Sequence, residues 1–249
     1  MYKRIVIICL VVFFGCKEHN EVLSAQEVID KSISVSGGES YVYNKISFDF
    51  RGITYTSTPV GNQKILTRQS RTDSTEILDV RSLDGFERFV NDSLVILPDT
   101  LTTAYSNAVN SVHYFAYLPY GLNDRAVQKR YLGKTKIGPS EYYEIEVTFN
   151  ENGGGDDFDD TYIYWFNTKT FKPDYLAYEF HVDGGGQRFR VAFNERIVGN
   201  IRFVDYKNYK SKNTDVPISS IDSLYTNESL ELLSEITLDN IKVTPDSYN

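Results

Sequence analysis

The sequence predicts a mainly β protein of the α+β class: a curved antiparallel half-barrel sheet with an amphipathic helix covering its concave face. Aromatic residues are abundant, with 19 Tyr and 15 Phe among 249 residues, and aromatic side chains favour half-buried pleated strands. Many segments alternate apolar and polar residues, which is typical of strands with one buried face. One segment, Leu101–Leu118, carries a helical apolar stripe instead. Antiparallel strands interrupted by one such helix predict a sheet that the helix covers.

The first residues predict a secretory signal. Lys3 and Arg4 precede the apolar run Ile5–Phe14, which is well short of the ~20 residues that a membrane-spanning helix needs. The run stops at Gly15, and polar residues follow Cys16 at once. A positive start, a short apolar core and a small residue before the break are the features of a signal peptide. Residues 1–15 are therefore interpreted as a signal peptide, and residues 16–23 as a polar tether.

Cys16 is the candidate lipidation site. The stretch FFGC that ends on it resembles a bacterial lipobox, which implies cleavage before the cysteine and lipid, including palmitate, at the new N-terminus. If Cys9 leaves with the signal, Cys16 is the one remaining thiol, and a free thiol is a liability in an oxidising compartment. The alternatives are an ordinary signal with an incidental cysteine, or a Cys9–Cys16 disulfide. The lipid interpretation predicts an envelope protein anchored to a membrane, with the leaflet left open.

Residues 24–249 are expected to form one half-barrel-like domain that begins with a helix. Ser24 and Glu27 have capping-box spacing, and Gly37-Gly38 can end the helix. A strand follows over residues 46–50, and the apolar parity flips after Gly52. Because a slip of one residue moves every side chain to the other face, we predict a bulge or bend at Gly52. Further strands are expected at 64–69, 75–81, 86–91 and 93–97.

The helix over Leu101–Leu118 is expected to start at a cap formed by Asp99 or Thr100 and to stop at Pro119. The stretch YGLNDRAVQK adds at most one short helix. The remainder alternates as a β meander, and its segment YIYWF is continuously aromatic, as in a strand covered on both faces. Later strands of the meander are expected around residues 143–149, 162–166, 176–182, 189–193 and 201–203, and in the closing segment 230–243.

Two resemblances follow from these residues. RYLGKTKIGPSEYYEIEVTF resembles a strand–turn–strand of the half-barrel proteins that carry lipoproteins across the periplasm, and of their outer-membrane acceptor. SGGESYVYNKISFDFRG, VNSVHYFAYLPYGLND, GGGDDFDDTYIYWF and DGGGQRFRVAFN resemble an uncharacterised family of Gram-negative envelope lipoproteins. The first resemblance implies a curved sheet with a helix-plugged cavity. Together they imply a lipid-anchored protein of the outer membrane, on its periplasmic or cell-surface side, and they imply no activity.

Charge and motifs exclude several classes of function. The formal net charge is −8, and no basic stripe suits a nucleic-acid partner. The sequence has no nucleophile elbow, zinc-protease motif, phosphate-binding loop or dinucleotide fingerprint. With only three histidines to serve as bases, we expect a non-enzymatic protein without a cofactor; a hydrolase is the less favoured interpretation. The oligomeric state stays open.

The polar side of the central helix supplies candidate ligand-binding residues. They are Asn110, His113, Tyr114 and Tyr117. A histidine beside an amide and two phenols suits ligand binding or catalysis, although a helix-face histidine bonded to its neighbours is the more common arrangement. A hydrophobic or envelope-derived ligand in a cavity beneath this helix is the leading interpretation. The alternative is an interaction subunit of an envelope complex with a filled core.

An acidic, glycine-rich loop supplies a second set of candidates. Asp156, Asp157, Asp159 and Asp160 could ligate calcium, although their spacing departs from the calcium-loop pattern and a solvated hairpin loop is the alternative. The order of a meander predicts that this loop and Gly184–Gly186 share one end of the sheet. We therefore expect Arg188 or Arg190 to lie near Asp156 or Asp157.

Overall fold

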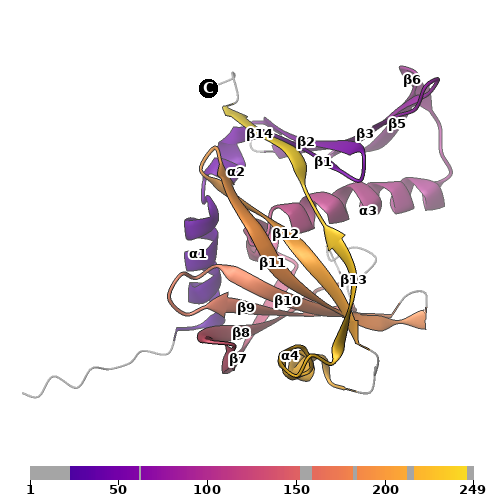
Figure 1. Ribbon diagram of the computed structural model, residues 1–249. Helices are drawn as coiled ribbons and strands as arrows, with labels where there is room; N and C mark the ends of the chain where they lie inside the picture. The colour runs from indigo at the N-terminus through magenta and orange to yellow at the C-terminus, as the bar shows by residue number, and fades with distance from the viewer. Residues whose placement is uncertain (1–22, 62, 152–158, 182–183, 212–215, 246–249) are drawn as a thin grey trace, which may run out of the picture.

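The computed structural model describes residues 23–61, 63–151, 159–181, 184–211 and 216–245. Its strands form two open antiparallel sheets of seven strands each, with helices between and around them (Figure 1). The predicted mainly β, antiparallel class is confirmed. The predicted single sheet is replaced by two, which we call sheet A and sheet B. Among the helices of the described ranges, none is long and apolar enough to cross a membrane.

Sheet A contains the strands of the first half of the domain and one C-terminal strand. In spatial order its strands are β14 (Asp239–Pro245), β1 (Asn44–Phe50), β2 (Ile53–Val60), β3 (Gln63–Arg71), β4 (Glu76–Ser82), β5 (Gly85–Val90) and β6 (Ser93–Val95). Every neighbour from β1 to β6 is also the next strand in the chain, so this part is a meander of short hairpins. The order brings the last strand of the protein beside the first, Asn44 opposite Pro245.

Sheet B is a meander of longer strands. In spatial order they are β13 (Leu230–Ile236), β12 (Ile201–Ser211), β11 (Gly186–Val198), β10 (Pro173–Phe180), β9 (Thr161–Asn167), β8 (Ser140–Phe149) and β7 (Val127–Ile137). The alternation of apolar residues gives this sheet two covered faces. We call the face that bears Ile145, Tyr164 and Leu176 the inner face and the one that bears Trp165 and Phe189 the outer face.

The two sheets separate where the chain passes from β13 to β14. Leu238 lies at this junction and turns into the core between the sheets, where only 5% of it is exposed. Its backbone amide donates to Asp205 Oδ1 at 3.0 Å. Arg196 pairs with the same carboxylate and also donates to the Leu238 carbonyl. A bend that moves a strand from one sheet to another makes a corner, so one predicted sheet becomes two.

The predicted bulge at Gly52 is wrong, because the chain makes a hairpin there. Arg51 and Gly52 have φ values of 53° and 75°, and Phe50 pairs with Ile53 across the turn. Two central residues with positive φ form the tight turn that suits the twist of paired strands, and glycine adopts such a φ readily. The change of apolar parity in the sequence therefore marks a reversal of the chain.

Helix α1 (Ala25–Ser36) begins with the predicted capping box, in which Ser24 accepts from the Glu27 amide and the Glu27 carboxylate accepts from the Ser24 amide. Val28 and Ile29 of α1 are fully buried in the core on the inner face of sheet B. The shorter helices are α2 (Ser40–Tyr43), η1 (Tyr120–Asn123), η3 (Ile218–Ser220) and α4 (Ile221–Thr226). Of these, η3 and α4 cover the outer face of sheet B.

Helix α3 (Asp99–Ala116) is the predicted amphipathic helix and lies between the two sheets (Figure 1). Its predicted side-chain cap is wrong: the N-cap residue is Pro98, which has no side-chain hydrogen bond, and Asp99 is in the first turn. The helix packs against β3, β4 and β5 of sheet A. Tyr114 and Phe115, near its other end, reach the core of sheet B. Because the helix packs on sheet A and also contacts sheet B near its C-terminal end, one apolar stripe does not describe its packing.

Candidate ligand-binding site

A cavity of about 650 Å³ lies between α3 and the inner face of sheet B. This volume is within the range of about 300–1,000 Å³ found for small-molecule sites. We call it the inner-face pocket. Its wall consists of aromatic and aliphatic side chains, with charged groups among them. The lining residues are Arg81, Asn110, Ser111, Tyr114, Phe115, Leu118, Asp124, Ala126, Val127, Phe149, Asp160, Tyr162, Tyr164, Leu176, Tyr178, Phe180, Arg188 and Arg190.

The floor of the inner-face pocket is an array of aromatic rings. Tyr162 and Tyr178 are paired residues of β9 and β10, and their rings stack with centroids 5.5 Å apart. Tyr164 follows two residues along β9, on the same face, and its centroid is 6.4 Å from that of Tyr162. The ring of Phe149 meets Tyr162 edge to face. Alternation along a strand places such residues on one face, and the result is a broad apolar surface that packs against other apolar groups.

The roof is one side of the second half of α3. Asn110 and Tyr114 are spaced four residues apart on α3, as residues on one helix face are, and line the cavity together with Leu118, which follows the helix. The Tyr114 ring meets Phe149 of the floor at 6.1 Å. Its hydroxyl oxygen is buried and has no hydrogen-bond partner among the described residues. Burial raises the pKa of the Tyr114 phenol above its ordinary value, so the group is neutral and can donate a hydrogen bond.

Two arginines stand beside this aromatic floor. Arg190 donates to the Tyr178 hydroxyl at 3.1 Å and its guanidinium lies 5.0 Å from the Tyr178 ring. Its buried Nε has no hydrogen-bond partner in the described part of the chain. Arg188 lies 4.8 Å above the ring of Phe180. Within the described ranges, the ion pairs do not include either arginine with a carboxylate. Both cations line the pocket, and within the described ranges the Nε of Arg190 is left without an acceptor.

The remaining charged lining groups are Arg81, Asp124 and Asp160. Burial raises the pKa of the Asp124 carboxyl, an effect that Lys129 partly opposes. Burial likewise lowers the pKa of the Arg81 guanidinium. Both shifts have one physical cause, which is that charged forms lose hydration in a site walled by apolar rings. Among the described lining residues, three arginines stand against two aspartates.

The structure separates the four residues predicted on the polar side of α3. Asn110 and Tyr114 line the inner-face pocket, whereas His113 and Tyr117 are buried against sheet A. The imidazole of His113 is 3.1 Å from the Thr67 carbonyl through Nε2 and 3.1 Å from the Tyr117 hydroxyl through Nδ1. A carbonyl can only accept, so Nε2 carries the hydrogen and Nδ1 accepts from Tyr117. This is the arrangement of a histidine bonded to its neighbours, and it fastens α3 to β3.

The described residues include only part of the acidic loop. Asp156 and Asp157 lie outside the described residues, so the calcium site and the arginine contact predicted there stay predictions. Asp159 is exposed, while Asp160 is buried and lines the same pocket as Arg188 and Arg190. The described residues contain no group of three or more side chains arranged to hold a metal ion. Thr161 pairs with Glu179 and Phe180 pairs with Gly186, so the chain enters β9 and β11 at the same end of sheet B, in the strand order predicted.

Sequence reasoning missed the floor of the pocket. The sequence indicates Tyr162, Tyr164 and Tyr178 only as strand aromatics, and it predicts Arg188 and Arg190 only as partners for the acidic loop. A signal existed in the alternation of tyrosine along β9 and of arginine along β11. It predicts that the tyrosines lie in a row on one face of the sheet and that the arginines do so too. It does not predict that a cavity lies over that face.

Comparisons place these observations among known proteins. A family model described as a family of unknown function (DUF6503) matches residues 75–238, and no curated protein matches the chain. In overall structure the chain is similar to a LolA superfamily protein, NE2245, from Nitrosomonas europaea, with a TM-score of 0.48, 12% identity, and 90% of this chain and 92% of that chain covered. It is also similar to a DUF1329 family protein from Desulfovibrio piger, with a TM-score of 0.49, 11% identity, and 91% and 95% covered. A domain from Vibrio parahaemolyticus described as an outer membrane lipoprotein-sorting protein gives a TM-score of 0.43, 10% identity, and 88% and 90% covered.

Proposed function

Because this chain belongs to DUF6503, a family of unknown function, we propose its function from its own geometry. It is a non-enzymatic protein of the cell envelope that binds an amphiphile, with an apolar chain and an anionic head group, in the inner-face pocket. The observation that carries the proposal is the position of two buried polar groups, Tyr114 Oη and Arg190 Nε, beside an aromatic floor. Buried polar groups are nearly always satisfied in native proteins. The described residues leave these two groups without a partner beside the cavity, which supports a ligand there.

The two parts of the ligand match two parts of the pocket. Tyr162, Tyr164 and Leu176 offer an apolar surface on which an acyl chain loses contact with water, at a gain of about 0.8 kcal/mol for each buried CH₂. Arg188 and Arg190 offer donors for an anionic head group, and hydrogen bonds to charged groups contribute about 1.5–3 kcal/mol. The Tyr114 hydroxyl supplies one further donor from the roof. A cavity at this place supports ligand binding over the alternative of an interaction subunit with a filled core.

Closing the pocket from its roof provides the first test. Ser111 is exposed on α3 and lines the cavity. Ser111→Trp should therefore fill the cavity without disturbing a packed core and reduce the affinity for the probe 11-(dansylamino)undecanoic acid at least tenfold. The measurement is dansyl fluorescence with the unlipidated Cys16→Ser protein. Thr103→Trp places the same ring on an exposed position of α3 that does not line the cavity, and it should bind within twofold of the parent. Equal affinity in both variants would rule out this pocket as the site.

Recognition of the head group is tested by competition. Palmitate and hexadecanol have chains of the same length and differ in the charge of the head group. The difference between their affinities, each measured by displacement of the dansyl probe, therefore gives the contribution of the head group. Arg190→Gln should lower the affinity for palmitate about tenfold, since it removes one charge-assisted contact. The affinity for hexadecanol should stay within twofold of the parent. If the affinities for both competitors fall by the same factor, Arg190 supports the shape of the pocket and does not bind the anionic head group.

The envelope location is also a proposal, and it rests on Cys16, which lies outside the described residues. Wild-type protein should incorporate labelled palmitate and sediment with membranes, because two or more acyl chains anchor a protein firmly. Cys16→Ala should lose both the label and the sedimentation. Label retained by that variant would contradict lipidation at this residue.

A further inference from the structure

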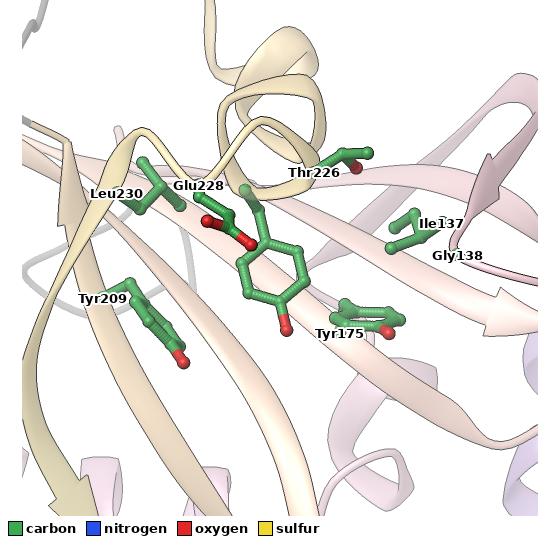
Figure 2. A pocket seen from close by; sticks show the side chains of 8 residues that line it. Ile137, Gly138, Tyr175, Tyr209, Thr226, Glu228 and Leu230 are labelled. Atoms are coloured by element: carbon green, nitrogen blue, oxygen red, sulfur yellow. The ribbon is translucent and has the colours of Figure 1, made fainter.

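A second cavity, of about 470 Å³, lies on the opposite side of sheet B, where α4 and the loop after it meet the outer face (Figure 2). The inner-face pocket does not include any of its residues. Its lining residues come from β7 and the turn after it, β10, β12, α4 and β13. They are Ile137, Gly138, Tyr175, Tyr209, Tyr225, Thr226, Glu228 and Leu230. We call it the outer-face pocket.

Three of the described lining residues are tyrosines. The Tyr225 ring is 5.8 Å from that of Tyr175 and 5.5 Å from that of Tyr209, at interplanar angles of 55° and 68°. Figure 2 shows Tyr209 and Tyr175 on either side of the ring that lies between them. All three tyrosines line the cavity, and the angles between their rings turn them in different directions. A cation held there contacts the negative faces of more than one ring.

The wall is fixed from below. Phe189 is fully buried and stacks with Tyr225 at 4.8 Å and with Tyr175 at 5.7 Å. Tyr225 belongs to α4, and the turn after α4 is closed by bonds from the Asn227 amide to the Ser223 carbonyl and from the Ser229 amide to the Leu224 carbonyl. The rings are thus fixed by packing against one another and against Phe189, which reduces the ordering that binding requires.

Among the described lining residues, Glu228 is the one charged residue. Its backbone has φ 55°, and its amide donates to the Tyr225 carbonyl at 3.0 Å, so the turn holds it over the tyrosines. In Figure 2 its carboxylate is directed toward them. The ion pairs between described residues do not include Glu228. A rigid aromatic wall with one available carboxylate is complementary to a positive charge.

We propose that the outer-face pocket binds an organic cation of the quaternary ammonium class, held by the faces of Tyr175, Tyr209 and Tyr225 and by the carboxylate of Glu228. A quaternary ammonium fits better than a primary one, because its methyl groups pack against Ile137 and Leu230 and it offers no N–H that needs an acceptor. The same head occurs free, as in choline, or on a phosphocholine lipid, and the chemistry of the pocket serves both. This site is independent of the ligand of the inner-face pocket.

The test compares choline with 3,3-dimethylbutan-1-ol, which has the same shape without the charge. Binding to the unlipidated Cys16→Ser protein is followed by NMR titration of the tyrosine resonances. Choline should bind saturably and the neutral alcohol at least fivefold more weakly, in line with the strength of cation–π contacts. Glu228→Gln should lower the affinity for choline about threefold to tenfold at low salt. The matched control is Glu231→Gln, an exposed carboxylate that pairs with Lys210 outside the pocket, and it should leave choline binding unchanged.

Further variants separate the remaining outcomes. Tyr209→Leu keeps an apolar side chain and should lower the affinity for choline about tenfold, because it removes one aromatic face. Ser111→Trp should leave choline binding unchanged, which distinguishes failure here from failure at the inner-face pocket. Displacement of choline by phosphocholine vesicles would support a lipid head group, and its absence would support a free cation. Equal binding of the neutral alcohol, or wild-type affinity in both Glu228→Gln and Tyr209→Leu, would overturn the proposal.

Discussion

Replacing Asp79 by alanine is expected to lower the free energy of unfolding by about 3–5 kcal/mol. The carboxylate is 1% exposed and accepts from two arginines of neighbouring strands, Arg68 at 2.5 and 2.9 Å and Arg88 at 2.6 and 2.9 Å. Without it, two half-buried guanidinium groups face each other with no counter-charge. Urea denaturation of the Asp79→Ala and parent proteins measures the difference.

The same variant should weaken the roof of the inner-face pocket. The Arg88 guanidinium lies 3.5 Å from the ring centre of Tyr105 on α3, so the Asp79 cluster holds the first half of the helix on sheet A. The matched control is Glu141→Ala, which breaks the exposed pair with Lys134 and should cost less than about 1 kcal/mol. A loss of stability in Asp79→Ala no larger than in this control would contradict the assignment of a buried, interdependent cluster.

Acid should destabilise the protein through His113. Burial lowers the pKa of this imidazole from its ordinary value of 6.5 to about 4, against the opposing effect of the Thr67 carbonyl. As pH falls below 6.5, His113 is protonated in the unfolded chain, whereas in the folded chain it is not protonated until pH is near 4. The stability contributed by the neutral ring is therefore complete above pH 6.5 and lost by pH 4. Such a shift corresponds to about 3 kcal/mol.

A comparison of variants isolates this contribution. The Glu144 carboxyl has its pKa raised to about 7 by burial, and it acts in the opposite direction, since its folded form binds a proton first. The expected result is that His113→Gln shows a smaller loss of stability between pH 6.5 and 4 than the parent, with the same Glu144 background in both. His181→Gln, at an exposed position, should follow the parent. Parallel pH profiles for His113→Gln and the parent would show that this ring does not set the acid dependence.

The parts of the fold that could be predicted from sequence depend on local patterns. The capping box of Ser24 and Glu27, the strands of both meanders and the length of α3 each follow from residues close together in the chain. The division at Leu238 could not, because it depends on a hydrogen bond to Asp205, 33 residues away in sequence. Helix α4 is six residues long, too short for apolar periodicity to be recognised, and with it the outer-face pocket escaped prediction.

The candidate site was predicted in part for a related reason. Asn110 and His113 are three residues apart on α3, and periodicity places them on one broad polar side. The structure assigns them to different layers, since α3 has a sheet on each side. The periodicity of a helix predicts which residues share a face. It does not predict how many other elements pack against the helix.

The fastening of α3 has a consequence for what the inner-face pocket can hold. The helix is tied to sheet A through His113 and through the arginines around Asp79, whereas the aromatic floor belongs to sheet B. The roof and the floor of the cavity are therefore positioned by different sheets, which join at Leu238 and share the buried core around Ile201 and Phe203. The width of the pocket, and with it the thickness of the ligand that it can hold, depends on how the two sheets pack against each other in that core.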